Sequence, residues 1–149
     1  ATGKPIVMVN CSGSAMAMPW EAAHLPAIVQ AWYPGEEGGQ AIAQILFGQV
    51  NPAGRLPITF YASTSDLPSL EAYSMANRTY RYFTGKPLYA FGYGLSYTKF
   101  DYSDAKLAAE TVAANDTIKL SFTVSNTGAR DGDEVARRDL TRQSADVDD

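Results

Sequence analysis

The sequence predicts an α/β fold in which the closing part of an open sheet is followed by the first strands of an incomplete β-sandwich. Three observations support this fold class. Residues 1–60 alternate short apolar runs with a stretch of helical spacing, residues 61–99 are rich in aromatic side chains without periodicity, and residues 118–124 alternate apolar and polar positions. We therefore expect an α/β domain end at 1–60, an irregular connector at 61–99 and the start of a β domain at 100–149.

The first sixty residues have the pattern of a sheet covered on both faces. Residues 6–9 form a short β-rich apolar run, expected as a strand buried on both sides. A short helix or loop is expected at 18–22, and a second strand at 27–32 ends at a Pro-Gly pair. Residues 40–47 have apolar positions at helical spacing, and residues 56–60 form a short proline-containing run, expected as an edge strand.

The second part of the chain predicts fewer strands than a complete sandwich needs. Residues 118–124 read as a half-buried antiparallel strand, and residues 132–135 are expected to open the next one. A β-sandwich has about seven strands, so this domain is incomplete. Residues 137–149 are polar and acidic, and we expect them to fray.

Composition excludes several classes of protein. Apolar residues make up 46% and charged residues 19% of the 149 residues, which is typical of a globular chain. The net charge of −4 and the lack of a basic cluster argue against nucleic acid or a membrane as partner. No apolar run reaches the roughly 18 residues needed for a membrane-spanning helix.

The sequence predicts neither a metal site nor a cofactor. A single cysteine, Cys11, excludes an internal disulfide and a cysteine-based zinc site, and a single histidine, His24, cannot build a zinc site. A nucleophilic pair of Cys11 and His24 would need a third orienting group. We interpret them instead as a buried thiol and an imidazole at a helix end. The glycines at 35–39 form no phosphate-binding pattern, which argues against a nucleotide-binding domain.

Three groups of motifs occur in a specific order. The first group is Ala-Trp-Tyr-Pro-Gly-Glu-Glu-Gly-Gly at 31–39, followed by Ala-Ile-Ala-Gln-Ile-Leu-Phe-Gly at 41–48 and Asn-Pro-Ala-Gly-Arg-Leu-Pro-Ile-Thr-Phe at 51–60. The second group is Tyr-Ser-Met at 73–75 and Arg-Thr-Tyr-Arg-Tyr-Phe at 78–83. The third is Lys-Pro-Leu-Tyr-Ala-Phe-Gly-Tyr-Gly-Leu-Ser-Tyr-Thr-Lys-Phe at 86–100.

Over residues 4–100 this ordered set resembles glycoside hydrolase family 3, with the second group closest to its β-xylosidase-like branch. The tail to about Val135 is similar to the start of that family's fibronectin type III-like domain. The resemblance implies an enzyme with a (β/α)8 barrel, an α/β sandwich and a fibronectin type III-like domain. Residues 136–140 depart from the family, because they are charged where it usually has apolar and aromatic residues.

The resemblance implies the closing part of an open α/β sandwich sheet, followed by the first strands of an incomplete fibronectin type III-like β-sandwich. It implies a fragment of a retaining exo-acting β-glycosidase that hydrolyses O-glycosyl bonds and is of β-xylosidase or β-glucosidase type. In the family, the aspartate nucleophile lies in the barrel and the acid/base carboxylate commonly lies upstream of the segment matched by residues 4–9. No residue of this chain is therefore expected to be catalytic, and the isolated chain is predicted to be inactive.

The implied partners are a β-linked oligosaccharide or glycoside, bound by the complete enzyme, and the missing upstream domains of the same protein. A periplasmic or secreted location is also implied. The competing interpretation is a stand-alone, non-catalytic carbohydrate-binding or interaction module. Sugar affinity in the isolated chain would favour that alternative, and a complete upstream reading frame would favour the enzyme fragment.

Glu36 and Glu37 are the conspicuous pair of carboxylates. Retaining glycoside hydrolysis needs two facing carboxyls about 5–5.5 Å apart, whereas adjacent residues project in different directions. The sequence favours a structural role at the start of a helix, where the helix dipole stabilises negative charge. However, the pair follows a strand, and open α/β sheets bind ligands at the carboxyl ends of strands. A contact at the rim of a sugar site is the alternative.

Several aromatic residues invite a sugar-stacking interpretation, because the C–H faces of pyranose rings pack on aromatic side chains. The competing interpretation is that these rings attach the connector to its domains. An arginine between two tyrosines could bind a sugar hydroxyl, although pairing with a carboxylate is favoured. The candidate substrate-binding residues are Trp32, Tyr33, Glu36, Glu37, Tyr80, Arg81 and Tyr82.

Overall fold

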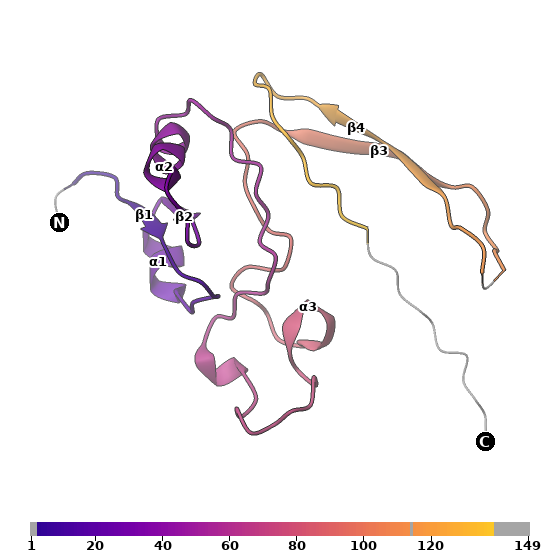
Figure 1. The fold of residues 1–149 in the computed structure, drawn as a ribbon, viewed down its shortest axis with the longest axis horizontal. Coiled ribbons are helices and arrows are strands. Elements are labelled where there is room, and N and C mark those ends of the chain that lie inside the picture. Colours follow the sequence, from indigo (N-terminus) through magenta and orange to yellow (C-terminus); the bar gives the residue numbers. More distant parts are fainter. Residues whose placement is uncertain (1–2, 114, 139–149) are drawn as a thin grey trace.

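The computed structural model describes residues 3–113 and 115–138, and its first part is a β-α-β unit followed by a helix. Strand β1 (Val7–Asn10), helix α1 (Pro19–His24), strand β2 (Ala27–Gln30) and helix α2 (Gly38–Leu46) lie together (Figure 1). The two strands are parallel, in a register that pairs Val7 with Ala27 and Asn10 with Gln30. A helix between two parallel strands is the crossover that such pairing requires, so the prediction of α/β units for this part is confirmed.

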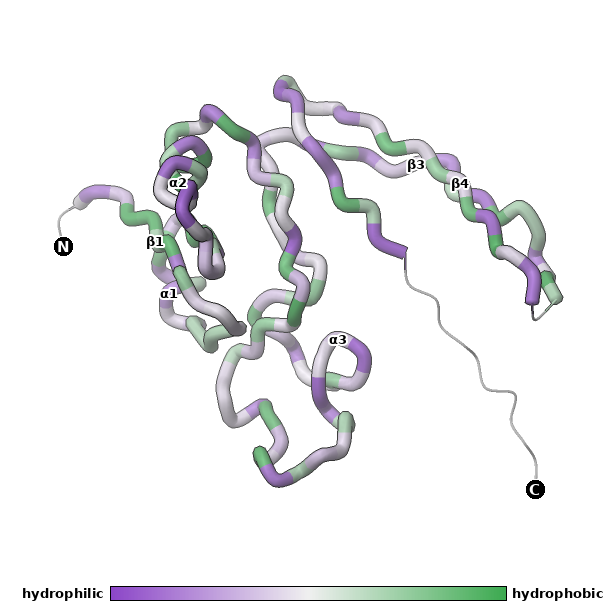
Figure 2. The backbone as a smooth tube through the Cα atoms, in the orientation of Figure 1, coloured by the Kyte–Doolittle hydropathy of each residue, from purple (hydrophilic) through white to green (hydrophobic). Residues whose placement is uncertain are grey.

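Strand β1 lies one residue later than expected and is not buried on both faces. Ile6 is 56% exposed and Val7 44% exposed. Within the described residues β1 pairs with β2 alone. The β-rich apolar pattern suits a strand covered by helices on both faces, but a two-stranded pair with two short helices cannot supply that cover. Figure 2 shows the apolar character of β1.

The two helices follow from local sequence. Helix α1 has a proline at its first position, where the missing N–H costs nothing. Helix α2 covers most of the stretch predicted at 40–47 and begins two residues earlier, at Gly38, where the ring of Pro34 leaves no space for a side chain. It ends before Gly48, whose φ of 69° is the left-handed conformation that stops helices.

The expected edge strand at 56–60 is not a regular strand. The N–H of Leu56 donates to the carbonyl of Tyr93 at 2.8 Å, and the N–H of Phe60 donates to the carbonyl of Tyr89 at 2.9 Å. Only the pair Phe60–Tyr89 forms an isolated antiparallel bridge. Pro57 lies between the two donors and has no N–H, so the ladder of hydrogen bonds cannot be continuous.

Residues 61–99 contain two single turns of helix, η1 (Thr64–Asp66) and α3 (Thr79–Tyr82), and the isolated bridge at Tyr89. Among the described residues the fully buried apolar side chains are Met18 and Phe60. The ring of Phe60 makes edge contacts with Trp32 and with Tyr89, at centroid distances of 6.2 Å and 6.3 Å. The core therefore lies where the strand unit meets the connector.

Strands β3 (Phe100–Leu107) and β4 (Leu120–Asn126) form an antiparallel pair that extends away from the other elements (Figure 1). Strand β4 confirms the antiparallel strand predicted at 118–124, displaced by two residues, but the expectation that it is half-buried is wrong, because every residue after Leu120 is exposed in a hairpin that nothing else among the described residues covers. The register shifts between Ser103 and Lys106, where Asp104 has a φ of 55°. Along this hairpin apolar and polar residues alternate (Figure 2), and the rings of Tyr102 and Phe122 approach to 5.9 Å.

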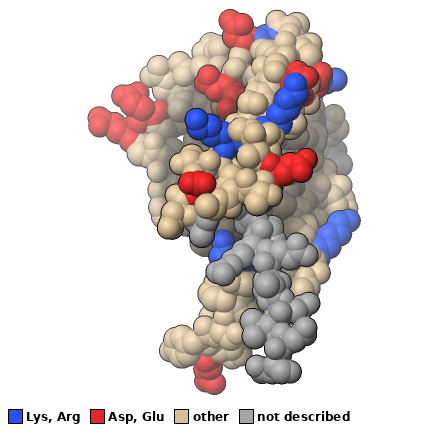
Figure 3. Space-filling model, turned by 90° about the vertical axis from the view of Figure 1, so that its right-hand side faces the viewer, with Lys and Arg blue, Asp and Glu red and all other residues tan. Residues whose placement is uncertain are grey.

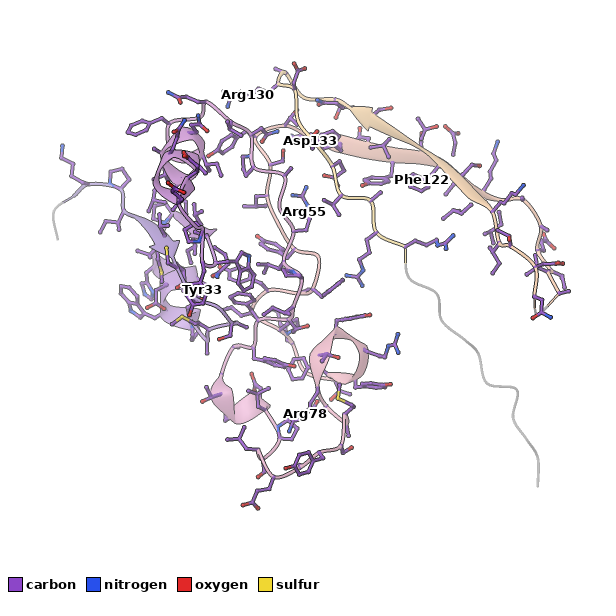
Figure 4. All side chains as sticks on the ribbon, in the orientation of Figure 1. Tyr33, Arg55, Arg78, Phe122, Arg130 and Asp133 are labelled. Atoms are coloured by element: carbon purple, nitrogen blue, oxygen red, sulfur yellow. The ribbon has the colours of Figure 1, made fainter. Side chains whose placement is uncertain are left out.

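The strand expected at 132–135 is not formed. Residues 127–138, called here the return segment, instead run back along the connector. Arg130 Nη2 donates to the carbonyl of Gly48 at 2.6 Å, and Arg55 forms a salt bridge of 2.6 Å with Glu134 (Figure 4). Polar contacts with residues 48–55 have replaced pairing with a strand. Of the tail predicted to fray, residues 139–149 lie outside the described residues.

None of the helices in the described ranges has the length and apolar content to cross a membrane.

Candidate functional site

The carboxyl ends of β1 and β2 lie at the same edge of the sheet, because the strands are parallel. The loop that follows β2 contains Tyr33, Glu36 and Glu37, and it leads directly into α2. The prediction that these three residues lie on a turn between a strand and a helix is confirmed. Figure 4 places Tyr33 at this end of the strand pair.

A polar network joins the two strand ends. Asn10 is buried, and its Nδ2 donates to Gln30 Oε1 at 2.6 Å and to Ser12 Oγ at 3.0 Å. Gln30 Nε2 donates in turn to the carbonyl oxygen of Ser12 at 3.3 Å. Sequence reasoning missed this network, although a polar residue at the end of each apolar run was the signal available. The network fixes the loop after β1 relative to the loop after β2.

Tyr33 is the most exposed of the aromatic candidates, with 78% of its surface accessible. Its ring lies against Gly13: a Cβ atom added to that glycine would lie 2.5 Å from Tyr33 Cε2. The preceding residue, Trp32, has a φ of 57°, which is uncommon for a bulky residue. Backbone strain of this kind persists where the surrounding structure imposes it, and it clusters at functional sites.

Glu36 and Glu37 are both exposed. Glu37 occupies the N-cap position of α2, as the sequence predicted, but its side chain makes no capping hydrogen bond. An acid/base carboxyl in a glycosidase needs surroundings that keep it protonated, and these two carboxylates face solvent. They can accept hydrogen bonds from a ligand that lies against the neighbouring Tyr33 ring.

The other three candidates lie on α3. The ring of Tyr80 stacks on Phe91 at 4.4 Å, a contact within the connector itself. Arg81 and Tyr82 are exposed. The side-chain hydrogen bond with Tyr82 and, next, the electrostatic attraction of Tyr80 raise the pKa of Arg81 above its ordinary value. Within the described residues, Arg81 does not form the carboxylate pair that the sequence favoured.

Thr79, at the start of α3 and directly before Tyr80, has a φ of 58°. A non-glycine residue with a positive φ therefore occurs at the β2–α2 turn, in Trp32, and also beside the candidates on α3. Beside α3 is a hollow of about 210 Å³. Its lining residues come from three parts of the chain, namely Thr59, Tyr80, Phe83, Pro87, Ala90, Phe91 and Arg137. The group on the β2–α2 turn and the group on α3 lie on different elements (Figure 4), and the structure does not join them in one pocket.

The structure contradicts the prediction for Cys11 and confirms the prediction for His24. Cys11 is exposed, so the prediction of a buried thiol is wrong; it follows directly after the last residue of β1, where the chain leaves the sheet. His24 is the last residue of α1, as predicted. Its Nδ1 lies 2.7 Å from the carbonyl oxygen of Trp20, and its ring stacks on the Trp20 ring at 4.5 Å.

The charged side chains do not gather into one large field on the face drawn in Figure 3, where basic and acidic residues are interspersed. Such a surface does not select strongly for a polyanion. The β2–α2 turn presents one exposed aromatic ring and two exposed carboxylates.

Curated proteins with similar sequences are glycosidases. The chain is 52% identical over 135 residues to a xylan 1,4-beta-xylosidase of Xylanibacter ruminicola, with 91% of this chain and 15% of that protein covered. It is 42% identical over 147 residues to a periplasmic beta-glucosidase of Salmonella typhimurium, with 91% of this chain and 19% of that protein covered. The chain thus spans less than a fifth of the length of these relatives.

Solved structures with a similar fold also belong to glycosidases. Beta-glucosidase 3B of Thermotoga neapolitana in complex with alpha-D-glucose aligns with a TM-score of 0.75 at 32% identity, covering 85% of this chain and 19% of that one. A beta-glucosidase of Erythrobacter marinus aligns with a TM-score of 0.68 at 40% identity, covering 82% and 16%.

The family model described as the glycosyl hydrolase family 3 C-terminal domain matches residues 1–97. This range includes the β-α-β unit, the β2–α2 turn and nearly all of the connector. The match extends over well more than half of the chain. It also agrees with the ordered motifs read from the sequence. This chain belongs to glycoside hydrolase family 3 and contains its C-terminal domain.

Proposed function

We propose that this chain acts as the rear part of a retaining, exo-acting β-glycosidase of β-xylosidase or β-glucosidase type. The observation that carries the proposal is the extent of the similarity. Relatives named as xylosidases and glucosidases match 91% of this chain, while the chain spans 15% and 19% of two of them. The activity of such an enzyme would depend on parts of the protein that this chain does not contain.

In this proposal residues 1–60 are the end of an α/β sandwich domain, residues 61–99 a connector and residues 100–149 the start of a fibronectin type III-like domain. The incomplete cover of β1 supports the first assignment, because an apolar parallel strand belongs between two layers of helices. The β3–β4 hairpin supports the last one, because two isolated strands are marginally stable until more strands or a helix cover them.

The chain would contribute scaffold and contacts at the rim of the sugar site. The primary contacts would come from Trp32, Tyr33, Glu36 and Glu37, with secondary contacts from Tyr80, Arg81 and Tyr82. The exposure of the Tyr33 ring beside two exposed carboxylates supports this role. An aromatic face binds the C–H face of a sugar, and carboxylates accept hydrogen bonds from its hydroxyl groups.

The chain would not carry out the chemistry. Retaining hydrolysis needs a nucleophile and a proton donor on the same glycosidic bond, about 5–5.5 Å apart. Glu36 and Glu37 are adjacent and exposed, so they do not form an enclosed, facing pair. General acid catalysis alone gives about 10²–10⁴-fold acceleration, whereas enzymes usually reach about 10⁶-fold or more.

The test is a hydrolysis assay with aryl β-xyloside and aryl β-glucoside on highly purified chain. We expect no turnover above the rate of a buffer control. The variants Glu36→Gln and Glu37→Gln serve as matched controls, because they keep the shape of each side chain. Turnover that co-purifies with the chain and disappears in either variant would make that glutamate catalytic and overturn the proposal.

A periplasmic or secreted location is part of the same proposal, and the relative named as a periplasmic beta-glucosidase supports it. Fractionation of the source cells, followed by detection with an antibody against residues 60–80, would test the location. Detection in the cytoplasm alone would contradict it.

A further inference from the structure

We propose that Gly13 is a positioning residue, which holds the ring of Tyr33 in one orientation as a platform for the C–H face of a β-linked sugar. This inference rests on the proposed function, in which the β2–α2 turn contacts substrate. It adds a residue from a different loop, at the end of the neighbouring strand, to the set that orients the sugar.

The contact between the two residues is close. A Cβ atom at position 13 would lie 2.5 Å from Cε2, 3.0 Å from Cζ and 3.2 Å from the hydroxyl oxygen of Tyr33. The outer edge of the ring therefore lies in the space that any larger residue at position 13 would occupy. With 78% of its surface exposed, Tyr33 would otherwise be free to change rotamer.

The glycine itself is fixed from the sheet side. Ser12 Oγ donates to the carbonyl oxygen of Ser14 at 2.9 Å, which closes the short turn around Gly13. Ser12 Oγ also accepts a hydrogen bond from Asn10 Nδ2 at 3.0 Å, and Asn10 is buried at the end of β1. The surface against which the ring lies is thus connected to the strand pair.

The backbone of Tyr33 is fixed on both sides as well. Before it, the ring of Trp32 makes an edge contact at 6.2 Å with Phe60, which is buried. After it, the ring of Pro34 packs against Gly38, the buried first residue of α2. An aromatic ring that is exposed yet oriented by its surroundings loses little entropy when a ligand stacks on it, so it is suited to binding.

The chemistry of this surface indicates a neutral sugar with equatorial hydroxyl groups, as in β-linked xylose or glucose units. Such rings have apolar C–H faces that pack on Tyr33, while Glu36 and Glu37 are available to accept hydrogen bonds from hydroxyl groups at the ring edge. We use xylobiose and cellobiose as probes.

Two glycine variants separate positioning from a general effect of adding a methyl group. In Gly13→Ala, the added methyl group contacts the outer end of the exposed Tyr33 side chain. We expect the ring to rotate away and the urea unfolding midpoint to stay unchanged. Gly39→Ala is the matched control, because no atom lies within 4 Å of its added Cβ. Tyr33→Ala removes the platform itself.

The experiment uses 19F NMR of the full chain labelled with 3-fluorotyrosine to follow the Tyr33 ring, and isothermal titration calorimetry to measure the sugar affinity of every variant, both below the concentration at which the chain associates. We expect the Tyr33 signal to move on addition of xylobiose or cellobiose. Gly13→Ala should change the Tyr33 signal in the free chain and weaken sugar affinity about threefold to tenfold, the range for loss of one stacking contact. Gly39→Ala should leave both unchanged.

The outcomes distinguish this inference from the proposed function. If neither sugar moves the Tyr33 signal, or if Tyr33→Ala retains full affinity, the substrate contact of the turn fails and the inference fails with it. If Tyr33→Ala weakens binding and Gly13→Ala does not, the inference alone is overturned. If Gly13→Ala lowers stability, the double variant of Gly13→Ala with Tyr33→Ala is compared with Tyr33→Ala alone. A lower sugar affinity in the double variant would show that Gly13 does not act through Tyr33.

Discussion

Two threonines with similar burial differ in their hydrogen bonds. Thr59 is 6% exposed, and its Oγ1 has no partner among the described residues. Thr98 is 7% exposed, and its Oγ1 donates to Asn126 Oδ1 at 2.7 Å. A buried hydroxyl without a partner loses its bonds to water and gains nothing in return.

We therefore expect Thr59→Val to raise the free energy of unfolding by about 1 kcal/mol, because valine has the same shape without the hydroxyl. Thr98→Val should lower it by about 1 kcal/mol, since it removes a bond and leaves Asn126 Oδ1 with one donor fewer. Urea unfolding followed by circular dichroism measures both changes. A loss of stability in both variants would contradict the assignment of Thr59 as unpaired.

For single residues, the sequence predicts which turn, helix or strand a residue lies on better than it predicts which side chains that residue contacts. Strand β2 ends at Gln30, two residues before the end expected at 27–32, so the Pro-Gly pair at 34–35 does not itself stop the strand. The pair was nevertheless sufficient to place Glu36 and Glu37 on a turn before a helix. The contact between Gly13 and Tyr33 and the positive φ of Trp32 could not be predicted, because they arise from two loops that only the pairing of β1 with β2 brings together. The exposure of Cys11 has the same origin.

Among the elements, the return segment is joined to the rest by a group of three side chains. Arg55, which precedes the connector, forms a salt bridge of 2.6 Å with Glu134, and Tyr102 on β3 donates its hydroxyl to the other oxygen of Glu134 at 2.9 Å. The side chains of Arg55 and Glu134 are only 14% and 17% exposed. Partial burial makes this pair stronger than a typical surface salt bridge.

Glu134→Gln should lower the free energy of unfolding by about 1–2 kcal/mol, because it leaves the charge of Arg55 partly buried without a counter-charge. Lys119→Met, at an exposed position of the hairpin, is the control and should change it by less than about 0.5 kcal/mol. Urea unfolding measures both, and a double-mutant cycle with Arg55→Met isolates the pair. If Glu134→Gln and the control Lys119→Met lowered the free energy of unfolding equally, this result would count against the salt bridge.

The same group predicts a pH dependence. Desolvation and then the hydrogen bond to Glu134 raise the pKa of Tyr102 above the ordinary tyrosine value of 10.0. The bond needs the phenolic proton, so its contribution to stability is fully present below pH 10.0 and is lost as pH rises through the raised pKa. An absorbance titration of tyrosine ionisation should show a late component that Tyr102→Phe removes. If Tyr102→Phe removes an ordinary component instead, the hydrogen bond is absent in solution.

Helix α2 and strand β4 could be predicted because their apolar spacing is undisturbed. Strand β3 was not recognised, since Asp104 interrupts its alternation at the register shift. The prediction of a strand at 132–135 was wrong for another reason. Its charged residue Glu134 pairs with Arg55, 79 positions earlier, and periodicity does not encode such a long-range contact.

At the scale of the whole molecule, large apolar side chains remain uncovered. Leu70 is 94% and Tyr73 97% exposed on the connector, and Phe47 is 82% exposed at the end of α2. Soluble monomers rarely leave such residues in contiguous patches. The prediction that residues 61–98 pack against a neighbouring domain stays a prediction, which this exposure supports.

The isolated chain is therefore expected to bind a hydrophobic dye and to associate as its concentration rises. Sedimentation velocity across a concentration series, with dye fluorescence on the same samples, measures both. The paired variant Leu70→Ser and Tyr73→Ser should reduce dye binding and shift association to higher concentration. A monodisperse monomer at every concentration, without dye fluorescence and with strong amide-exchange protection across residues 73–97, would contradict the expectation.

Family membership was the property that the sequence predicted best. It depends on the order and spacing of motifs between residues 4 and 100, and the family match to residues 1–97 agrees with it. A fibronectin type III-like domain was harder to predict, because the two strands of the β3–β4 hairpin fit many β folds. Motif order identifies a family, whereas a single hairpin does not identify a fold.

The return segment has a consequence for the order in which this chain folds as it is synthesised. Paired residues of β1 and β2, such as Val7 and Ala27, are 20 positions apart, whereas Arg55 and Glu134 are separated by 79 positions and Gly48 and Arg130 by 82. Each doubling of loop length costs about 0.6 kcal/mol, so closing the longer loops costs roughly 1 kcal/mol more.

Synthesis proceeds from the N-terminus. The strand pair can therefore form once residues 7–30 have left the ribosome, while the contacts of Gly48, Asn51 and Arg55 with residues 130–134 require residues that are made some eighty positions later. Attachment of the return segment to residues 48–55 is thus a late folding event, set by residues 130–134.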